Sequence, residues 1–82
     1  MKVTFDPSVD AAYIYLIDEI GPGGVAKTYP CDPREVGGMI NLDFDSDGRL
    51  LGIEVLDATK KLSAGLLREA TILGRPSKEN AS

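Results

Sequence analysis

The sequence has no histidine and only one cysteine, Cys31, among its 82 residues. Without histidine, proton relays that work near neutral pH and histidine metal sites are excluded. Cys31 has no base partner beside it in the sequence, so a cysteine nucleophile is disfavoured. A single cysteine provides no disulfide framework, which is typical of a reducing compartment, and we expect a cytoplasmic protein.

Basic charge is also scarce. Nine Lys and Arg residues stand against 13 Asp and Glu, for a formal net charge of −4. The basic residues are scattered, so no basic face is predicted to neutralise phosphates, and we expect no direct nucleic-acid partner. No apolar run approaches the ~20 residues that span a bilayer, so we expect no membrane association.

Short apolar, β-branched and aromatic segments alternate with turn residues over the first two thirds of the chain. This spacing is typical of short strands. Pro30 cannot donate a ladder hydrogen bond, so the strand that contains it ends there or lies at a sheet edge. Strands are predicted at residues 2–5, 11–18, 25–30, 39–44 and 49–56.

After Asp57 the apolar residues recur at helical spacing, which predicts one amphipathic helix. Its apolar stripe consists of Leu62, Leu66, Ala70 and Leu73. Asp57 or Ser63 is expected to cap its start. Gly74 and Pro76 are expected to end it.

Strands followed by a helix predict an α+β domain: an antiparallel β-meander of four to five strands with one C-terminal helix packed on one face. Residues 1–74 are expected to form this single domain, and residues 75–82 a flexible polar tail. A domain of this size buries only about 60–65% of its unfolded surface. Oligomerisation is therefore an expected source of additional stability.

The stretch from Asp43 to Glu54 has the spacing of a helix-loop-helix calcium loop, with Asp45 and Asp47 at the intermediate positions. Such a loop needs a helix on each side, whereas both flanks here alternate apolar residues with period two, as strands do. A hairpin is therefore the favoured interpretation. Its open acidic strip forms no closed oxygen cage, so we expect no calcium.

The length of the hairpin turn decides its register. A two-residue turn at Asp47–Gly48 makes every facing pair on one side apolar: Phe44 with Leu51, Leu42 with Ile53, and Ile40 with Val55. A three-residue turn sets Ile40 against Glu54, so the pattern favours the two-residue type I′ turn. Asp43, Asp45, Asp47 and Glu54 stay candidate ligands only for two less favoured alternatives. These are a divalent-cation site and a metal-assisted hydrolase that uses Asp43, Asp45 and Glu54.

Two segments carry a family resemblance: FDPSVDAAYIYL, which starts at Phe5, and INLDFDSDGRLLGIEVLDATKKL, which ends at Leu62. They resemble the small prokaryotic domain of unknown function 2283. Its members typically read Tyr-Asp-Pro-x-x-Asp-Ala-x-Tyr and later Asp-Gly-x-x-x-Gly-Ile-Glu-x-Leu-Asp-Ala. Phe5 replaces the first tyrosine, and the CDPREVGG segment departs from the family pattern. The resemblance implies a small β-meander with a terminal helix, and it implies no activity and no catalytic residues.

The strand predicted at residues 11–18 is apolar on both faces. If the helix covers the face of Ile14, the opposite face stays open, and tyrosines there are typical of interfaces. The residues predicted to bind a partner are Tyr13, Tyr15, Ile17, Leu50 and Leu56. The sequence thus predicts a non-enzymatic domain without a cofactor that acts by protein–protein contact, as a homodimer or other homo-oligomer, or with a small protein partner. An antitoxin-like regulatory module that binds one cognate protein is the alternative.

Overall fold

The computed structural model describes residues 1–73, so the predicted helix end at Gly74 and Pro76 and the tail at 75–82 lie outside the described residues. All five predicted strands are present, with somewhat different ends, and a short helix lies between the third and the fourth. The elements are β1 (Lys2–Asp6), β2 (Ala11–Tyr15), β3 (Lys27–Pro30), α1 (Pro33–Val36), β4 (Ile40–Phe44), β5 (Leu50–Leu56), α2 (Ala58–Lys61), α3 (Ala64–Arg68) and β6 (Thr71–Ile72).

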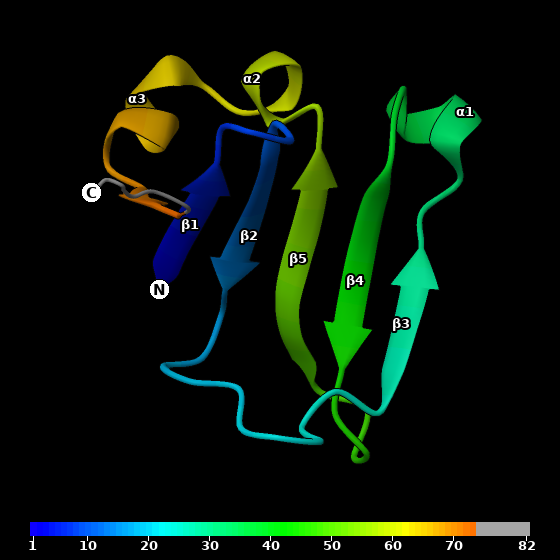
Figure 1. Ribbon diagram of the computed structural model, residues 1–82. Helices are drawn as coiled ribbons and strands as arrows, with labels where there is room; N and C mark the ends of the chain where they lie inside the picture. Colours follow the sequence, from blue (N-terminus) through cyan, green and yellow to red (C-terminus); the bar gives the residue numbers. More distant parts are fainter. Residues whose placement is uncertain (74–82) are drawn as a thin grey trace.

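The six strands of the described chain form one sheet in the order β3-β4-β5-β2-β1-β6 (Figure 1). The predicted meander is wrong, because β2 pairs with β5 rather than with β3. The two strongly apolar strands, β2 and β5, thereby take the centre of the sheet, where neighbours flank them on both sides. The GPGG segment lies in the long connection between β2 and β3, where Gly24 N donates to Gly21 O at 3.0 Å.

The end of the described chain also corrects the prediction. The expected single helix is divided into α2 and α3, and β6 then pairs with β1 in parallel, which makes the sheet mixed rather than antiparallel. The break has a local cause. Leu62 adopts an extended conformation after α2, and the Ser63 side chain accepts a hydrogen bond from Leu66 N to start α3. Within residues 1–73, no helix is long and apolar enough to cross a membrane.

The turn between β1 and β2 holds the start of α2. Asp10 has a φ of 53°, and its carboxylate accepts hydrogen bonds from Thr59 N at 3.0 Å and Thr59 Oγ1 at 2.8 Å. Its carbonyl accepts the N–H of Ala58 at 2.9 Å. Asp57 occupies the cap position without a capping side-chain bond. Asp10 thus supplies, from a distant segment, the cap that was predicted for Asp57.

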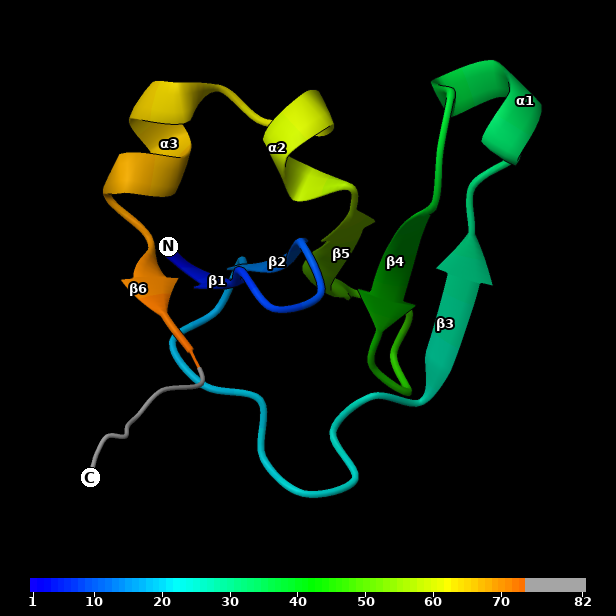
Figure 2. The same ribbon diagram turned by 45° about the horizontal axis from the view of Figure 1, so that its top comes forward.

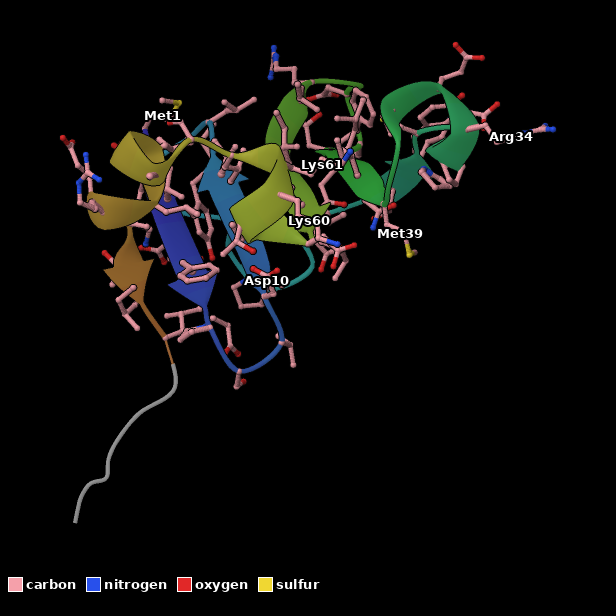
Figure 3. All side chains as sticks on the ribbon, turned by 90° about the horizontal axis from the view of Figure 1, so that it is seen from above. Met1, Asp10, Arg34, Met39, Lys60 and Lys61 are labelled. Carbon is pink, nitrogen blue, oxygen red and sulfur yellow. The ribbon has the colours of Figure 1, made fainter. Side chains whose placement is uncertain are left out.

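On its other side, α2 contacts the connection after α1. Lys61 Nζ donates to Val36 O at 2.9 Å, and a Cβ atom at Gly37 or Gly38 would lie 2.9 Å from the Lys61 side chain. Seen from above, Asp10 lies beside α2 and Lys61 points toward α1 (Figure 3). These contacts place α2 and α3 at one end of the sheet, beyond the carboxyl ends of β1 and β5 (Figures 1 and 2).

The predicted hairpin of β4 and β5 is present, with a different tip. Ile40 faces Val55 and Leu42 faces Ile53, as predicted, but Phe44 faces Leu50 instead of Leu51. The loop has three residues, 46–48, because Asp45 N donates to Arg49 O at 2.9 Å. A bulge at Leu51 then adds one residue to β5 and restores the apolar register.

The pairing divides the strand residues between two faces. The apolar face carries Val3, Phe5, Ala12, Ile14, Lys27, Tyr29, Ile40, Leu42, Phe44, Ile53, Val55 and Ile72. The polar face carries Lys2, Thr4, Asp6, Ala11, Tyr13, Tyr15, Thr28, Pro30, Asn41, Asp43, Gly52, Glu54, Leu56 and Thr71.

The core is small, and three of its four apolar side chains in residues 1–73 lie at the helix end of the sheet. Ala12 and Val55 are 4% and 2% exposed, and Ala58 of α2 is fully buried. Leu51 is the other buried apolar side chain among the described residues. One row further from the helices, Ile14, Leu42 and Ile53 are only half-buried. Buried apolar side chains therefore lie near both ends of β5, with a half-buried row between them.

Candidate functional site

A hydrogen-bonded group on the polar face joins three strands. The Tyr13 hydroxyl of β2 donates to Asp43 Oδ2 at 2.6 Å, and the Thr28 hydroxyl of β3 donates to Asp43 Oδ1 at 2.6 Å. Asp43 lies on β4, between these two donors in the sheet. Both of its carboxylate oxygens therefore have partners from the chain itself.

Tyr13 reaches Asp43 by lying across β5 at Gly52. A Cβ atom at Gly52 would lie 2.5 Å from the Tyr13 hydroxyl oxygen and 2.6 Å from Tyr13 Cε2. No side chain fits under the ring at these distances, so the glycine is needed for close approach rather than for a special backbone angle. Tyr13 is therefore the side chain that makes the close approach at Gly52.

The surroundings of Tyr13 change its acidity. Burial raises the pKa of Tyr13 well above its usual range, and the hydrogen bond to Asp43 and the charge of that carboxylate raise it further. The Tyr15 ring lies 4.7 Å from the Tyr13 ring, edge to face, and Lys2 Nζ lies 4.6 Å from the centre of the Tyr15 ring. Tyr13 is thus held as a neutral hydrogen-bond donor and is unsuited to act as a base near neutral pH.

The acidic stretch does not converge on one point. Asp45 Oδ1 accepts the backbone N–H groups of Asp47 and Arg49, each at 2.9 Å, and so organises the hairpin loop. Asp47 lies 3.6 Å from the Arg49 guanidinium at the exposed tip. Glu54 Oε1 accepts the Asn41 side-chain amide at 2.9 Å. In the described part of the chain, no group of three or more His, Cys, Asp or Glu side chains is placed to hold a metal ion.

The residues predicted to bind a partner do not form one surface. Tyr13, Tyr15 and Leu56 lie on the polar face and are half-buried, and Tyr13 is committed to Asp43. Ile17, beyond the end of β2, is 39% exposed. Leu50 pairs with Phe44 because the hairpin loop has three residues, so it follows the apolar face rather than the tyrosines. The polar face is thus a hydrogen-bonded surface with little continuous apolar area.

An open apolar surface was not predicted from the sequence, because one helix was assumed to cover the whole apolar face of the sheet. The open half of the apolar face, away from α2 and α3, is formed by Ile14, Leu16, Tyr29, Leu42, Phe44 and Ile53. Tyr29 is 53% exposed and Leu16 is 39% exposed, and the others are half-buried. A depression of about 430 Å³ adjoins this surface between Phe44 and the hairpin loop. The signal available in the sequence was Ser63, a strong cap residue that divides the helix into two short pieces.

A family model of proteins of unknown function, DUF2283, matches residues 2–58. No curated protein and no solved structure gives a significant match to the chain. The matched segment runs from β1 to the first residue of α2, and it includes Asp10, Tyr13, Asp43 and Gly52. The match confirms the resemblance carried by the FDPSVDAAYIYL segment and the hairpin, and α3 and β6 follow it. The chain therefore belongs to the DUF2283 family of proteins of unknown function.

Proposed function

We propose that this protein is a cytoplasmic, non-enzymatic domain that acts by protein–protein contact, with self-association as its main interaction. The observation that carries the proposal is the incomplete cover of the apolar face. Of the four buried apolar side chains in residues 1–73, two are alanines, and no large side chain is fully buried.

The free energy of folding makes this incomplete cover important. Burying apolar surface contributes roughly 25 cal/mol per Å², and a domain of this size has little stability to spare. Ile14, Leu42 and Ile53 are large side chains that are still partly in contact with water. A second copy on this face removes that surface from water without any change in the fold of the chain.

The open shape of the molecule supports the same conclusion. The radius of gyration is 13.8 Å, whereas a compact domain of this length is expected to have roughly 12 Å. The shortest dimension is 19 Å against a longest of 42 Å. A flat single sheet with short helices at one end accounts for these values (Figure 2).

The polar side chains support a non-enzymatic role. The hydroxyls of Tyr13 and Thr28 donate to Asp43, and the Asn41 amide donates to Glu54. A catalytic acid or base needs to be free to reach a substrate inside a concave site. The sequence has no histidine to do this work. The lone Cys31 is the basis for proposing a cytoplasmic location.

Solution mass measured by light scattering at several protein concentrations tests the proposal. The expected result is a species of twice the 8.8 kDa chain mass, which dissociates on dilution and does not respond to calcium. A monomer at every concentration contradicts self-association. A monomer that associates only when calcium is added would instead favour a cation site formed by Asp43, Asp45, Asp47 and Glu54.

A further inference from the structure

We infer that the self-associating surface is the open half of the apolar face, and that a second copy of the chain packs against it sheet on sheet. This inference rests on the proposed self-association and adds where the contact lies. It differs from the sequence prediction, which placed the contact on the tyrosines of the opposite face.

Charge distinguishes the two faces as surfaces for an identical partner. Among the strand residues assigned to the apolar face, Lys27 is the only charged one. The polar face carries Asp6, Asp43 and Glu54 against Lys2, three negative charges and one positive, for a net charge of −2. A two-fold symmetric contact sets the same patch against itself, so the polar face would bring like charges together.

The two edges of the sheet are poor alternatives, because β6 has only two residues and β3 ends in a proline. Cys31 N donates to Ile40 O at 2.8 Å, so Cys31 directs its backbone groups toward β4. The preceding residue, Pro30, then has its backbone nitrogen on the outer side of β3, where proline provides no donor. Proline at an outer edge is one of the devices that oppose strand-to-strand association. The faces are therefore the better candidates for contact between copies.

The position of the helices restricts how two copies are arranged. Because α2 and α3 stand at one end of the sheet, two copies facing each other with the same strand direction would bring their helices together (Figures 1 and 2). A two-fold axis that lies between the sheets and crosses the strands places the helices at opposite ends. Packed sheets are about 10 Å apart, so side chains such as Leu42 and Phe44 interdigitate at the centre of the contact.

Two neighbouring residues provide a matched test. Leu16 and Ile17 are each 39% exposed. Leu16 continues the pairing of β2 with β5, since its N–H donates to Leu51 O at 2.9 Å, and so follows Ile14 on the apolar face, whereas Ile17 lies in the bend that comes after. Leu16→Glu is compared with Ile17→Glu, and Tyr29→Glu adds a second variant on the apolar face. Circular dichroism verifies that each variant is folded.

Leu16→Glu and Tyr29→Glu are expected to raise the dissociation constant of the dimer by on the order of 100-fold, because each places two glutamates in one desolvated contact. Ile17→Glu is expected to leave it unchanged. If Ile17→Glu dissociates the dimer and the other two do not, the chosen face is wrong while self-association stands. If the unmodified protein is a monomer, the proposed function itself fails.

A measurement without substitutions keeps the inference testable if the glutamate variants do not fold. An environment-sensitive dye that binds apolar surfaces is added while the unmodified protein is diluted through its dissociation range. Dye fluorescence is expected to rise as the dimer dissociates, because the open half of the apolar face becomes exposed. Dissociation with no rise in fluorescence overturns the inference.

Discussion

The two faces of the sheet are completed in different ways. On the polar face, Tyr13, Thr28 and Asp43 satisfy one another, and Asn41 pairs with Glu54, all within one layer. On the apolar face, Ala12 and Val55 are buried at the end near α2, but Ile14, Leu42 and Ile53 are only half-buried. Hydrogen bonds are satisfied by neighbours in the same layer, whereas removing an apolar side chain from water requires a second layer.

This comparison explains why the tyrosines do not mark the interface. An aromatic residue on an open face is typical of contact surfaces, but Tyr13 lies flat over Gly52 and donates to Asp43. The aliphatic residues that were expected under a helix, such as Ile14, are the ones that remain only half-buried. Three predictions sharpen the contrast between the faces, in order of decreasing effect.

Replacing Gly52 with alanine is expected to have the largest effect. The added Cβ would lie 2.5 Å from the Tyr13 hydroxyl oxygen, so the ring must leave its place and lose Asp43. The free energy of unfolding is expected to fall by about 2–3 kcal/mol, in the range of overpacked sites. Denaturant titration at fixed protein concentration measures it.

The control for Gly52→Ala removes the ring first. In a Tyr13→Ala background, the same Gly52→Ala change is expected to cost less than about 1 kcal/mol, because the collision no longer exists. Equal costs in the two backgrounds would show that Tyr13 and Gly52 are not coupled.

Asp10→Ala tests whether the bonds from Asp10 hold α2 in place at the end of the sheet. It removes the bonds to Thr59 and places alanine at a φ of 53°. The free energy of unfolding is expected to fall by about 1–2 kcal/mol, as for other lost caps. Amide hydrogen exchange is expected to increase in α2 before it increases in β4. Asp10→Asn is the matched control, since asparagine tolerates this φ and keeps an acceptor, and a loss equal to that of alanine would contradict the capping role.

Tyr13→Phe is expected to have the smallest effect, about 1 kcal/mol for one partly exposed hydrogen bond. Because the folded protein binds the Tyr13 proton more tightly than the unfolded chain does, this contribution is fully present below about pH 10, the ordinary tyrosine pKa. It is lost as the pH rises further. Absorbance titration is expected to show a late transition, well above pH 10, for Tyr13. Disappearance of the late transition in Tyr13→Phe would verify the assignment.

Local patterns in the sequence predicted the hairpin well, and they failed where a longer-range choice was involved. Alternation placed Leu42 opposite Ile53 and Ile40 opposite Val55, and both pairs are present. The turn was wrong because Asp45 organises a three-residue loop, and the bulge at Leu51 corrects the register afterwards. The alternation of apolar residues predicts which residues face each other along most of the two strands. It does not reveal a turn that is one residue longer when a one-residue bulge compensates for it.

The strand order and the end of the fold depended on contacts between distant segments. Nothing near Ala11–Tyr15 indicates that its partner is Leu50–Leu56 rather than the next strand, and β6 has only two residues. The division of the helix follows from two caps: Ser63, which is local, and Asp10, which comes from another part of the chain. Among the candidate site residues, the acidic ones were located correctly on the hairpin, but their partners were not predictable.

By itself, the sequence determined the short strands, the apolar pairing of the central hairpin and the family, because each depends on residues close together along the chain. Only the tertiary structure decided which strands are neighbours, that Tyr13 covers Gly52, and how far α2 and α3 reach over the sheet. These outcomes depend on which surfaces compete successfully for burial across the whole chain. That competition left Leu42 and Phe44, on the open half of the apolar face, only half-buried by this chain.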